Sequence, residues 1–173
     1  DYNIADMLFK EGKAGMIING DWSWSSYQKA GINIGVAPLP KIVATGLYCA
    51  PMISPKGYSI NSNVEREKLS KIVDLLNFLL DVPQQYITAK ELNVMPTRKE
   101  VFEYEDIKGN EILINSGLQI DRGRAMPVVP ELRAVWDAMR PNYQSVLNGE
   151  KSPKQAAKDM QWLAIKKISE MNE

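Results

Sequence analysis

The longest regular pattern in the chain is a stripe of apolar residues at helical spacing in its middle third. Beyond Asn63, apolar side chains recur at intervals of three and four residues. They are Leu69, Ile72, Val73, Leu76, Leu79 and Leu80. This spacing predicts a long amphipathic helix that ends before Pro83. Leu75 and Phe78 add apolar surface beside the stripe, so we expect the helix to be covered by structure that need not lie in this chain.

Helical patterns also lie on both sides of this stripe. Asp21 is a candidate N-cap for a helix that carries Trp22, and Gly31 is placed to close that helix. Ser152 followed by Pro153 and Gln155 has the form of a capping box, which predicts a final helix running toward Met171. The other predicted helices span residues 4–10, 84–91, about 106–122 and 131–147.

Short apolar or alternating runs predict strands in the first third of the chain. Residues 15–18 are apolar and β-branched, residues 32–39 alternate, and a further strand is expected around residues 57–60. The first of these runs leads into an Asn19-Gly20 turn. Together with the helices, these strands predict an α/β fold with a helix-rich C-terminal half.

Size and charge narrow the class of protein. The chain has 173 residues, which fits one domain, or one domain plus part of another. Basic and acidic side chains number 21 each, so no net positive field favours nucleic acid. No apolar run approaches the length of a membrane helix. Because the chain begins at Asp1 without a signal segment, we expect it to be a processed, nicked or fragmentary form.

The residue types present exclude most catalytic mechanisms and most cofactor sites. Histidine is absent, which excludes histidine-based nucleophile systems and the commonest transition-metal ligand. The single Cys49 can neither form an internal disulfide nor supply a zinc cage, and no glycine-rich phosphate loop is present. We therefore expect no metal and no cofactor. A carboxylate pair of a glycoside-active enzyme is harder to exclude, because Asp21 and Asp137 lie near aromatic residues.

Tryptophans are the most informative side chains for binding. Trp22 follows a predicted strand at the start of a helix, the position where α/β folds place ligands. Its flat ring suits the C–H face of a pyranose, and polar neighbours can meet the hydroxyls. The alternative is that each tryptophan fills a core. Core is our expectation for Trp162, and periodicity alone also favours it for Trp136.

Several segments resemble the maltose/maltodextrin-binding proteins of ABC sugar importers. The resemblance is carried by FKEGKAGMIINGDWSW at residues 9–24, IGVAPLP at 34–40, MPVVP at 126–130, AVWDAMR at 134–140 and the closing helix after Ser152. Effectively the whole chain follows the order and spacing of that family. It implies a periplasmic-binding-protein-like fold of type II, with two lobes that close over a ligand.

The same resemblance implies how the chain is divided. Residues 1–52 and 111–173 would belong to the C-terminal lobe, and residues 53–110 would hold hinge crossings and a segment that packs on an absent N-terminal lobe. Without that lobe, we expect weak ligand binding, and the 53–110 segment to be mobile, domain-swapped or covered by another copy.

By the resemblance, Tyr2 hydrogen-bonds sugar, Trp22 and Trp136 stack on sugar rings, and Arg140 lies near the ligand, with a surface or ion-pair role open for Arg140. Trp24 is nearer to structural. Asp21 stands where the maltose-binding prototype has proline, so oligosaccharide class is a safer expectation than maltose itself.

The function implied is oligosaccharide capture for the permease of an ABC importer, without catalysis. The location implied is extracytoplasmic, either periplasmic or as a cell-surface lipoprotein. The alternatives are a glycoside-active enzyme fragment and a structural or protein-binding domain; in the latter, Trp22 and Trp136 would both be buried.

Overall fold

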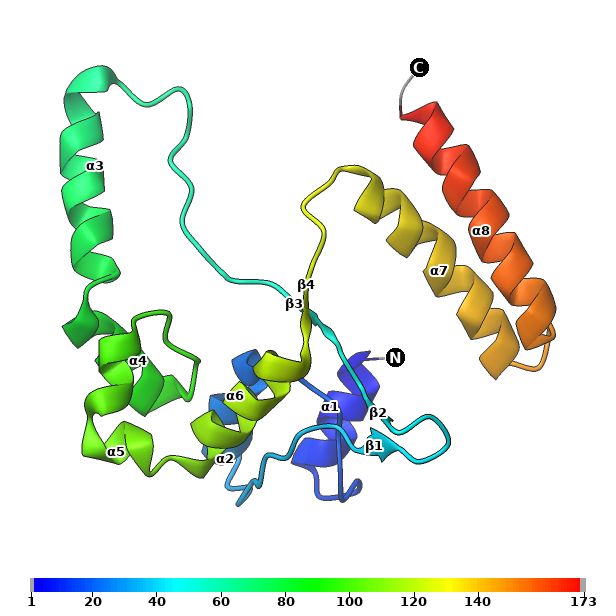
Figure 1. Ribbon diagram of the computed structural model, residues 1–173, viewed down its shortest axis with the longest axis horizontal. Coiled ribbons are helices and arrows are strands. Elements are labelled where there is room, and N and C mark those ends of the chain that lie inside the picture. The colour runs from blue at the N-terminus through cyan, green and yellow to red at the C-terminus, as the bar shows by residue number, and fades with distance from the viewer. Residues whose placement is uncertain (1, 172–173) are drawn as a thin grey trace. The chain divides into compact units, whose positions relative to one another are not determined.

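The computed structural model describes residues 2–171, and the chain forms two compact units, Asp1–Ala125 and Met126–Glu173 (Figure 1). The first contains α1 (Tyr2–Lys10), a 3-10 turn η1 (Asp21–Ser23), α2 (Trp24–Lys29), β1 (Lys41–Ile42), β2 (Leu47–Tyr48), β3 (Met52–Ile53), α3 (Arg66–Leu79), α4 (Val82–Leu92), a 3-10 turn η2 (Lys99–Glu103), α5 (Glu105–Lys108), α6 (Glu111–Arg122) and β4 (Arg124–Ala125). The second contains α7 (Glu131–Leu147) and α8 (Pro153–Glu170).

The helix that follows the Asn19-Gly20 turn starts differently from the prediction. Asp21 is the first residue of η1 rather than an N-cap; Gly20 holds the cap position, and no side chain caps the turn. The predicted cap at Asp21 is therefore wrong. The predicted end is confirmed, because Gly31 closes the helix with a φ of +80°, a conformation that glycine adopts without steric cost.

Three predicted strands are not formed. Residues 15–18, 32–39 and 57–60 carry no strand assignment. An extended segment becomes a strand only when a neighbour accepts and donates its backbone hydrogen bonds, and within residues 2–171 none pairs with these segments. Met16, in the first of them, is 91% exposed. The three expected strands are therefore wrong for residues 2–171.

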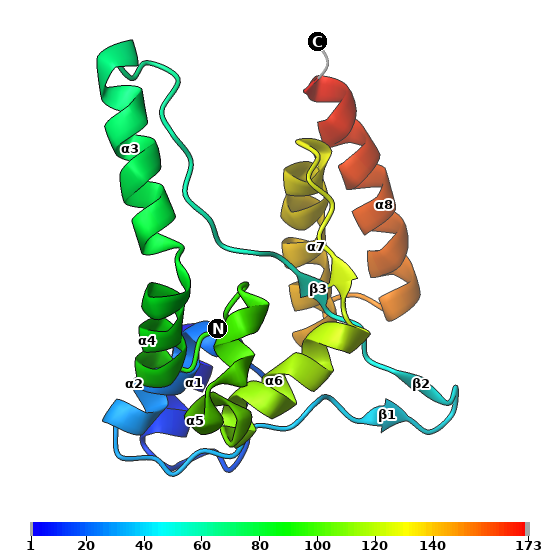
Figure 2. The ribbon, with the colours of Figure 1, turned by 60° about the vertical axis from the view of Figure 1, so that its left-hand side comes forward.

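The strands that do form are two-residue pairs. β1 and β2 make an antiparallel hairpin, and β3 pairs in parallel with β4, matching Met52 with Arg124 and Ile53 with Ala125 (Figures 1 and 2). Gly123 permits this approach, because a Cβ there would lie 2.1 Å from Cδ1 of Ile53. β3 and β4 therefore join segments about seventy residues apart in sequence.

The core of the first unit lies where α4, η2, α5 and α6 meet. Ala89, Val101, Ile107 and Leu113 are buried together, one from each of these elements. Helix α3 stands outside this core and has no buried residue. The predicted amphipathic helix is thus confirmed. Its apolar stripe is only partly covered, because Ile72, Leu76 and Leu79 are half-buried whereas Leu69, Val73 and Leu80 are exposed, and Phe78 beside it is 58% exposed.

The second unit is a helical hairpin in which α7 and α8 pack side by side (Figures 1 and 2). Small buried residues, Ala134 and Ala138 on α7 and Ala156 on α8, let the two backbones approach closely. The predicted cap is confirmed, because Oγ of Ser152 accepts a hydrogen bond from the Gln155 amide at 3.2 Å. The expectation that Trp162 fills a core is wrong: its side chain is 64% exposed on α8.

Candidate functional site

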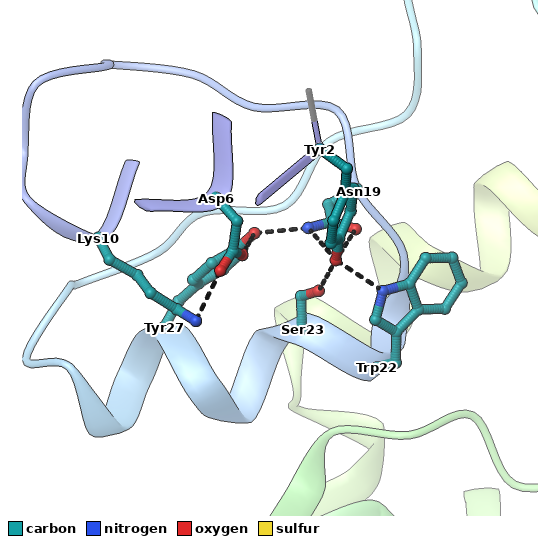
Figure 3. A network of polar contacts seen from close by, with 7 residues as sticks. All are labelled: Tyr2, Asp6, Lys10, Asn19, Trp22, Ser23 and Tyr27. Atoms are coloured by element: carbon teal, nitrogen blue, oxygen red, sulfur yellow. Dashed lines mark hydrogen bonds and ion pairs between the residues drawn. The ribbon is translucent and has the colours of Figure 1, made fainter. Parts of the chain in front are cut away.

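Two exposed aromatic side chains from different elements are joined by a hydrogen bond in the first unit. Tyr2 begins α1 and Trp22 lies in η1, and the indole Nε1–H of Trp22 donates to Oη of Tyr2 at 3.2 Å (Figure 3). The Tyr2 oxygen also lies 3.3 Å from the Asn19 side-chain amide and 3.5 Å from Oγ of Ser23. The indole is therefore held by its polar edge while 58% of the residue stays exposed.

Gly20 fixes the position of the Trp22 ring from one side. A Cβ at residue 20 would lie 2.2, 2.3 and 2.6 Å from Cζ3, Cη2 and Cε3 of the indole. An atom beside the ring edge, in the ring plane, cannot be that close to three consecutive carbons, so this point lies over the ring face. The glycine backbone thus packs against one face of Trp22, and a side chain at position 20 would displace the indole.

A second group of polar residues is linked to Tyr2 and Trp22 through Asn19. Asn19 also donates to Oη of Tyr27, whose hydroxyl in turn donates to Asp6 at 2.8 Å (Figure 3). Lys10 donates to the other carboxylate oxygen of Asp6 at 2.7 Å, one helical turn along α1. Tyr27 is fully buried, so its hydroxyl needs these partners. The network ties α1, the Asn19-Gly20 turn and α2 into one rigid support.

The ionisation of these groups follows from their partners. The Lys10 ammonium, followed by the Tyr27 hydroxyl, holds the pKa of Asp6 below its usual range, and Asp6 raises the pKa of Lys10. Burial, followed by the Asp6 carboxylate, raises the pKa of Tyr27. Hydrogen bonds from Ser23, Trp22 and Asn19 lower the pKa of Tyr2.

Helix α2 is anchored on its other side to α4 and α6. Nε1 of Trp24 donates to Oγ of Ser116 at 3.3 Å, so this half-buried tryptophan serves packing, in agreement with its expected structural role. Gln28 accepts a hydrogen bond from Asn93 at 2.8 Å, and Asn93 accepts one from Asn110 at 2.7 Å. The helix below Trp22 is therefore held by contacts far apart in sequence.

The remaining predicted site residues lie in the second unit. Trp136 and Arg140 are one turn apart on α7, and both are exposed, Trp136 at 46%. The structure brings Tyr2 together with Trp22, whereas the pairing of either with Trp136 or Arg140 stays a prediction. A purely structural domain would bury both Trp22 and Trp136, but both are exposed.

The arrangement offers binding groups rather than reactive ones. Within residues 2–171, no group of three metal-ligating side chains occurs, and no helix is long and apolar enough to cross a membrane. The supporting residues Asn19, Tyr27, Asp6 and Lys10 were not predicted for the site. The only sequence signal for them was the Asn19-Gly20 turn, because their contacts join positions up to 21 residues apart.

Comparisons with known proteins agree on one family. The family model described as bacterial extracellular solute-binding protein matches residues 1–115. A maltotriose-binding protein of Pyrococcus abyssi is 31% identical, across 90% of this chain and 34% of its own length. A galactooligosaccharide-binding protein of Bacillus subtilis is 29% identical, across 89% of this chain and 36% of its own. The chain thus spans about a third of the length of these curated relatives.

Solved structures give the same result. The maltose/maltodextrin-binding domain MalE of Bdellovibrio bacteriovorus, bound to maltotriose, superposes with a TM-score of 0.87 at 41% identity, covering 98% of this chain and 44% of that one. MalX of Streptococcus pneumoniae, in complex with maltopentaose, gives 0.86 at 26% identity, covering 96% and 44%. The predicted fold class, part of a type II periplasmic-binding-protein fold, is confirmed.

Proposed function

This chain belongs to the bacterial extracellular solute-binding protein family, and from that premise we propose that it forms one wall of an oligosaccharide-binding cleft. The observation that carries the proposal is the open Trp22 ring, fixed by Tyr2 at its polar edge and by Gly20 on one face. A rigid exposed indole presents an apolar plane to the C–H face of a sugar ring at little cost in conformational entropy. Tyr2, Asn19 and Ser23 add hydroxyl and amide groups at its rim.

The ligand class we propose is a malto-oligosaccharide or a related glycan. The Pyrococcus relative is named for maltotriose and the Bacillus relative for galacto-oligosaccharides, so the class is broader than maltose. Trp136 would add a second stacking surface from α7, with Arg140 one turn away as a donor to sugar oxygens. The family is described by solute binding and not by a reaction, so a carboxylate pair built on Asp21 and Asp137 is not favoured.

The partners and location follow the same proposal. A Streptococcus pneumoniae relative, 29% identical, is named a maltooligosaccharide ABC transporter solute-binding lipoprotein. We propose that the protein delivers its sugar to the membrane permease of an ABC importer, outside the cytoplasm. A periplasmic or lipid-anchored form is part of this proposal.

We base the proposed division of the chain between two lobes on the exposed apolar side chains of α3. Residues 1–52 and 111–173 would form the C-terminal lobe, and residues 53–110 would cross at β3 and pack on an N-terminal lobe. The uncovered apolar side chains of α3, Leu75 and Phe78 among them, support a covering surface that this chain does not supply. Alone, the chain would bind sugar weakly and pair with another copy through the same surface, which light scattering would detect.

The binding proposal is tested by calorimetric titration of the full-length protein with maltotriose and with a galacto-oligosaccharide. Stacking on an indole buries on the order of 50–100 Å² of apolar surface, about 1.3–2.5 kcal/mol, so Trp22→Ala should weaken binding by roughly 8- to 70-fold. Trp162→Ala is the matched control, because Trp162 is equally exposed but lies outside the proposed site. Equal affinities for the two variants would overturn the proposal for Trp22.

A further inference from the structure

A cation lies over the ring that we propose as the sugar platform. Nζ of Lys56 lies 5.3 Å from the centroid of the Trp22 ring. Lys56 belongs to the irregular segment that follows β3, and its side chain is exposed. Within residues 2–171 it makes no ion pair, so no carboxylate draws the ammonium away from the indole.

Only one face of this ring is available to any ligand. The Gly20 backbone occupies the other face, where even a methyl group would lie 2.2 Å from the ring. Lys56 therefore lies over the face that a sugar would need. The contact is electrostatic, an ammonium held by the negative face of the indole, and it depends on the ammonium and not on the aliphatic stem.

A stacked sugar and the ammonium cannot occupy this face together. Ring carbons in contact with the indole lie about 3.5–4.0 Å above it. For an ammonium above the centroid at 5.3 Å, the gap to such carbons would be about 1.3–1.8 Å, which is shorter than a van der Waals contact. Lys56 is exposed and lies in a segment without regular structure, so its side chain has room to move aside.

We propose that Lys56 is an affinity-setting residue that closes the open face of Trp22 in the unliganded protein and is displaced by an uncharged sugar. This inference rests on the proposed function of Trp22. The sugar must replace an exposed cation–π contact, which corresponds to about a two- to fivefold penalty in the dissociation constant. Lys56 thus tunes affinity downward without touching the bound sugar.

The test compares Lys56→Met with wild type in the full-length protein, using calorimetry with maltotriose and with a galacto-oligosaccharide. Methionine keeps a similar stem but no charge, so the dissociation constant should fall about two- to fivefold. Lys56→Arg, which keeps a cation, should match wild type. Lys41→Met is the control, because Lys41 lies over the Tyr48 ring, 5.8 Å from its centroid, and not over Trp22.

A second readout needs no sugar. Acrylamide is uncharged and quenches the fluorescence of exposed indoles. Without ligand, it should quench the fluorescence of Lys56→Met more strongly than that of wild type. With saturating ligand, it should quench the two proteins equally. Tighter binding by Lys56→Met that disappears in a Trp22→Ala background would support the proposal. Unchanged or weaker sugar binding by Lys56→Met would overturn it while the proposed function stands. Absence of sugar binding in every protein, with the acrylamide difference present, would overturn the function and the role of Lys56 in it.

Discussion

One buried asparagine, Asn93, joins α2 to the end of α4 and to the start of α6, and its contacts allow a quantitative prediction of stability. Asn93 is nearly fully buried at the C-terminal end of α4, with a φ of +55°. Its side chain donates to Gln28 at 2.8 Å and accepts from Asn110 at 2.7 Å. Asparagine suits this place because it tolerates the left-handed conformation and supplies both a donor and an acceptor.

Two substitutions separate the backbone contribution from the hydrogen bonds. Asn93→Gly loses both bonds but adopts the backbone conformation freely, so it should cost about 2 kcal/mol, at about 1 kcal/mol per bond. Asn93→Ala loses the same bonds and adds about 1–2 kcal/mol for a left-handed alanine, giving about 3–4 kcal/mol in total. Alanine should thus be the worse replacement, against the usual order of the two residues in helices.

The assay is urea unfolding of the full-length protein, together with hydrogen exchange of the Asn93 amide, which bonds to the Ala89 carbonyl at 3.0 Å. The exchange measurement reports this end of α4 even when the whole protein does not unfold in one step. Equal losses for glycine and alanine would show that the backbone conformation contributes nothing. Losses below about 0.5 kcal/mol for both would refute the energetic account of the hydrogen bonds.

Further predictions concern the platform, a helix cap and pH. Gly20→Ala should displace the Trp22 ring and weaken oligosaccharide binding in calorimetry, whereas Gly35→Ala, with open space at its Cβ position, should not. Ser152→Ala removes the cap of α8 and should lower stability by about 1 kcal/mol in urea titrations, a loss that Ser152→Asn should largely avoid. The pKa of Asp6 is depressed, so its contribution to stability is present above the ordinary carboxyl pKa of 3.8 and is lost as pH falls through the folded-state value. Melting temperature should therefore drop more steeply below about pH 4 in wild type than in Asp6→Asn, and parallel curves would contradict the ion pair.

Elements set by local physics were predictable from the sequence. Helix α3 was expected from its apolar spacing, and the start of α8 from Ser152 followed by Pro153, because side-chain periodicity and capping act over a few residues. Asp21 failed as a cap because Gly20 takes that position, where the ring of Trp22 leaves no room for a side chain. Periodicity also failed for Trp162, since a regular apolar stripe does not reveal which faces meet a partner.

The residues of the candidate site also differ in whether the sequence could indicate them. Trp22 was expected to bind sugar from its place at the start of a helix and from the family resemblance, although the strand expected before it is not formed. The roles assigned to Tyr2, Trp136 and Arg140 came from the same resemblance, and all four stay predictions. The support made by Asp6, Asn19 and Tyr27 could not be predicted, since its hydrogen bonds join α1 to α2 across an irregular segment. Lys56 was missed for the same reason, as 34 residues separate it from the ring it covers.

The expected strands that do not form and the exposed stripe of α3 share one feature: each lacks, within residues 2–171, a neighbouring segment to pair or pack with. An extended segment such as residues 32–39 needs a neighbour for its backbone groups, and the stripe on α3 needs a neighbour for its apolar side chains. Neither neighbour occurs within residues 2–171, although both segments have the sequence pattern of paired elements. The chain spans 44% of the Bdellovibrio binding domain, to which it is 41% identical. The Trp22 platform differs, since its contacts with Tyr2, Gly20 and Asn19 are complete within the first unit. The wall of the proposed cleft is therefore held by contacts within the first unit, whereas residues 32–39 have no strand partner within residues 2–171 and the stripe on α3 has no buried residue.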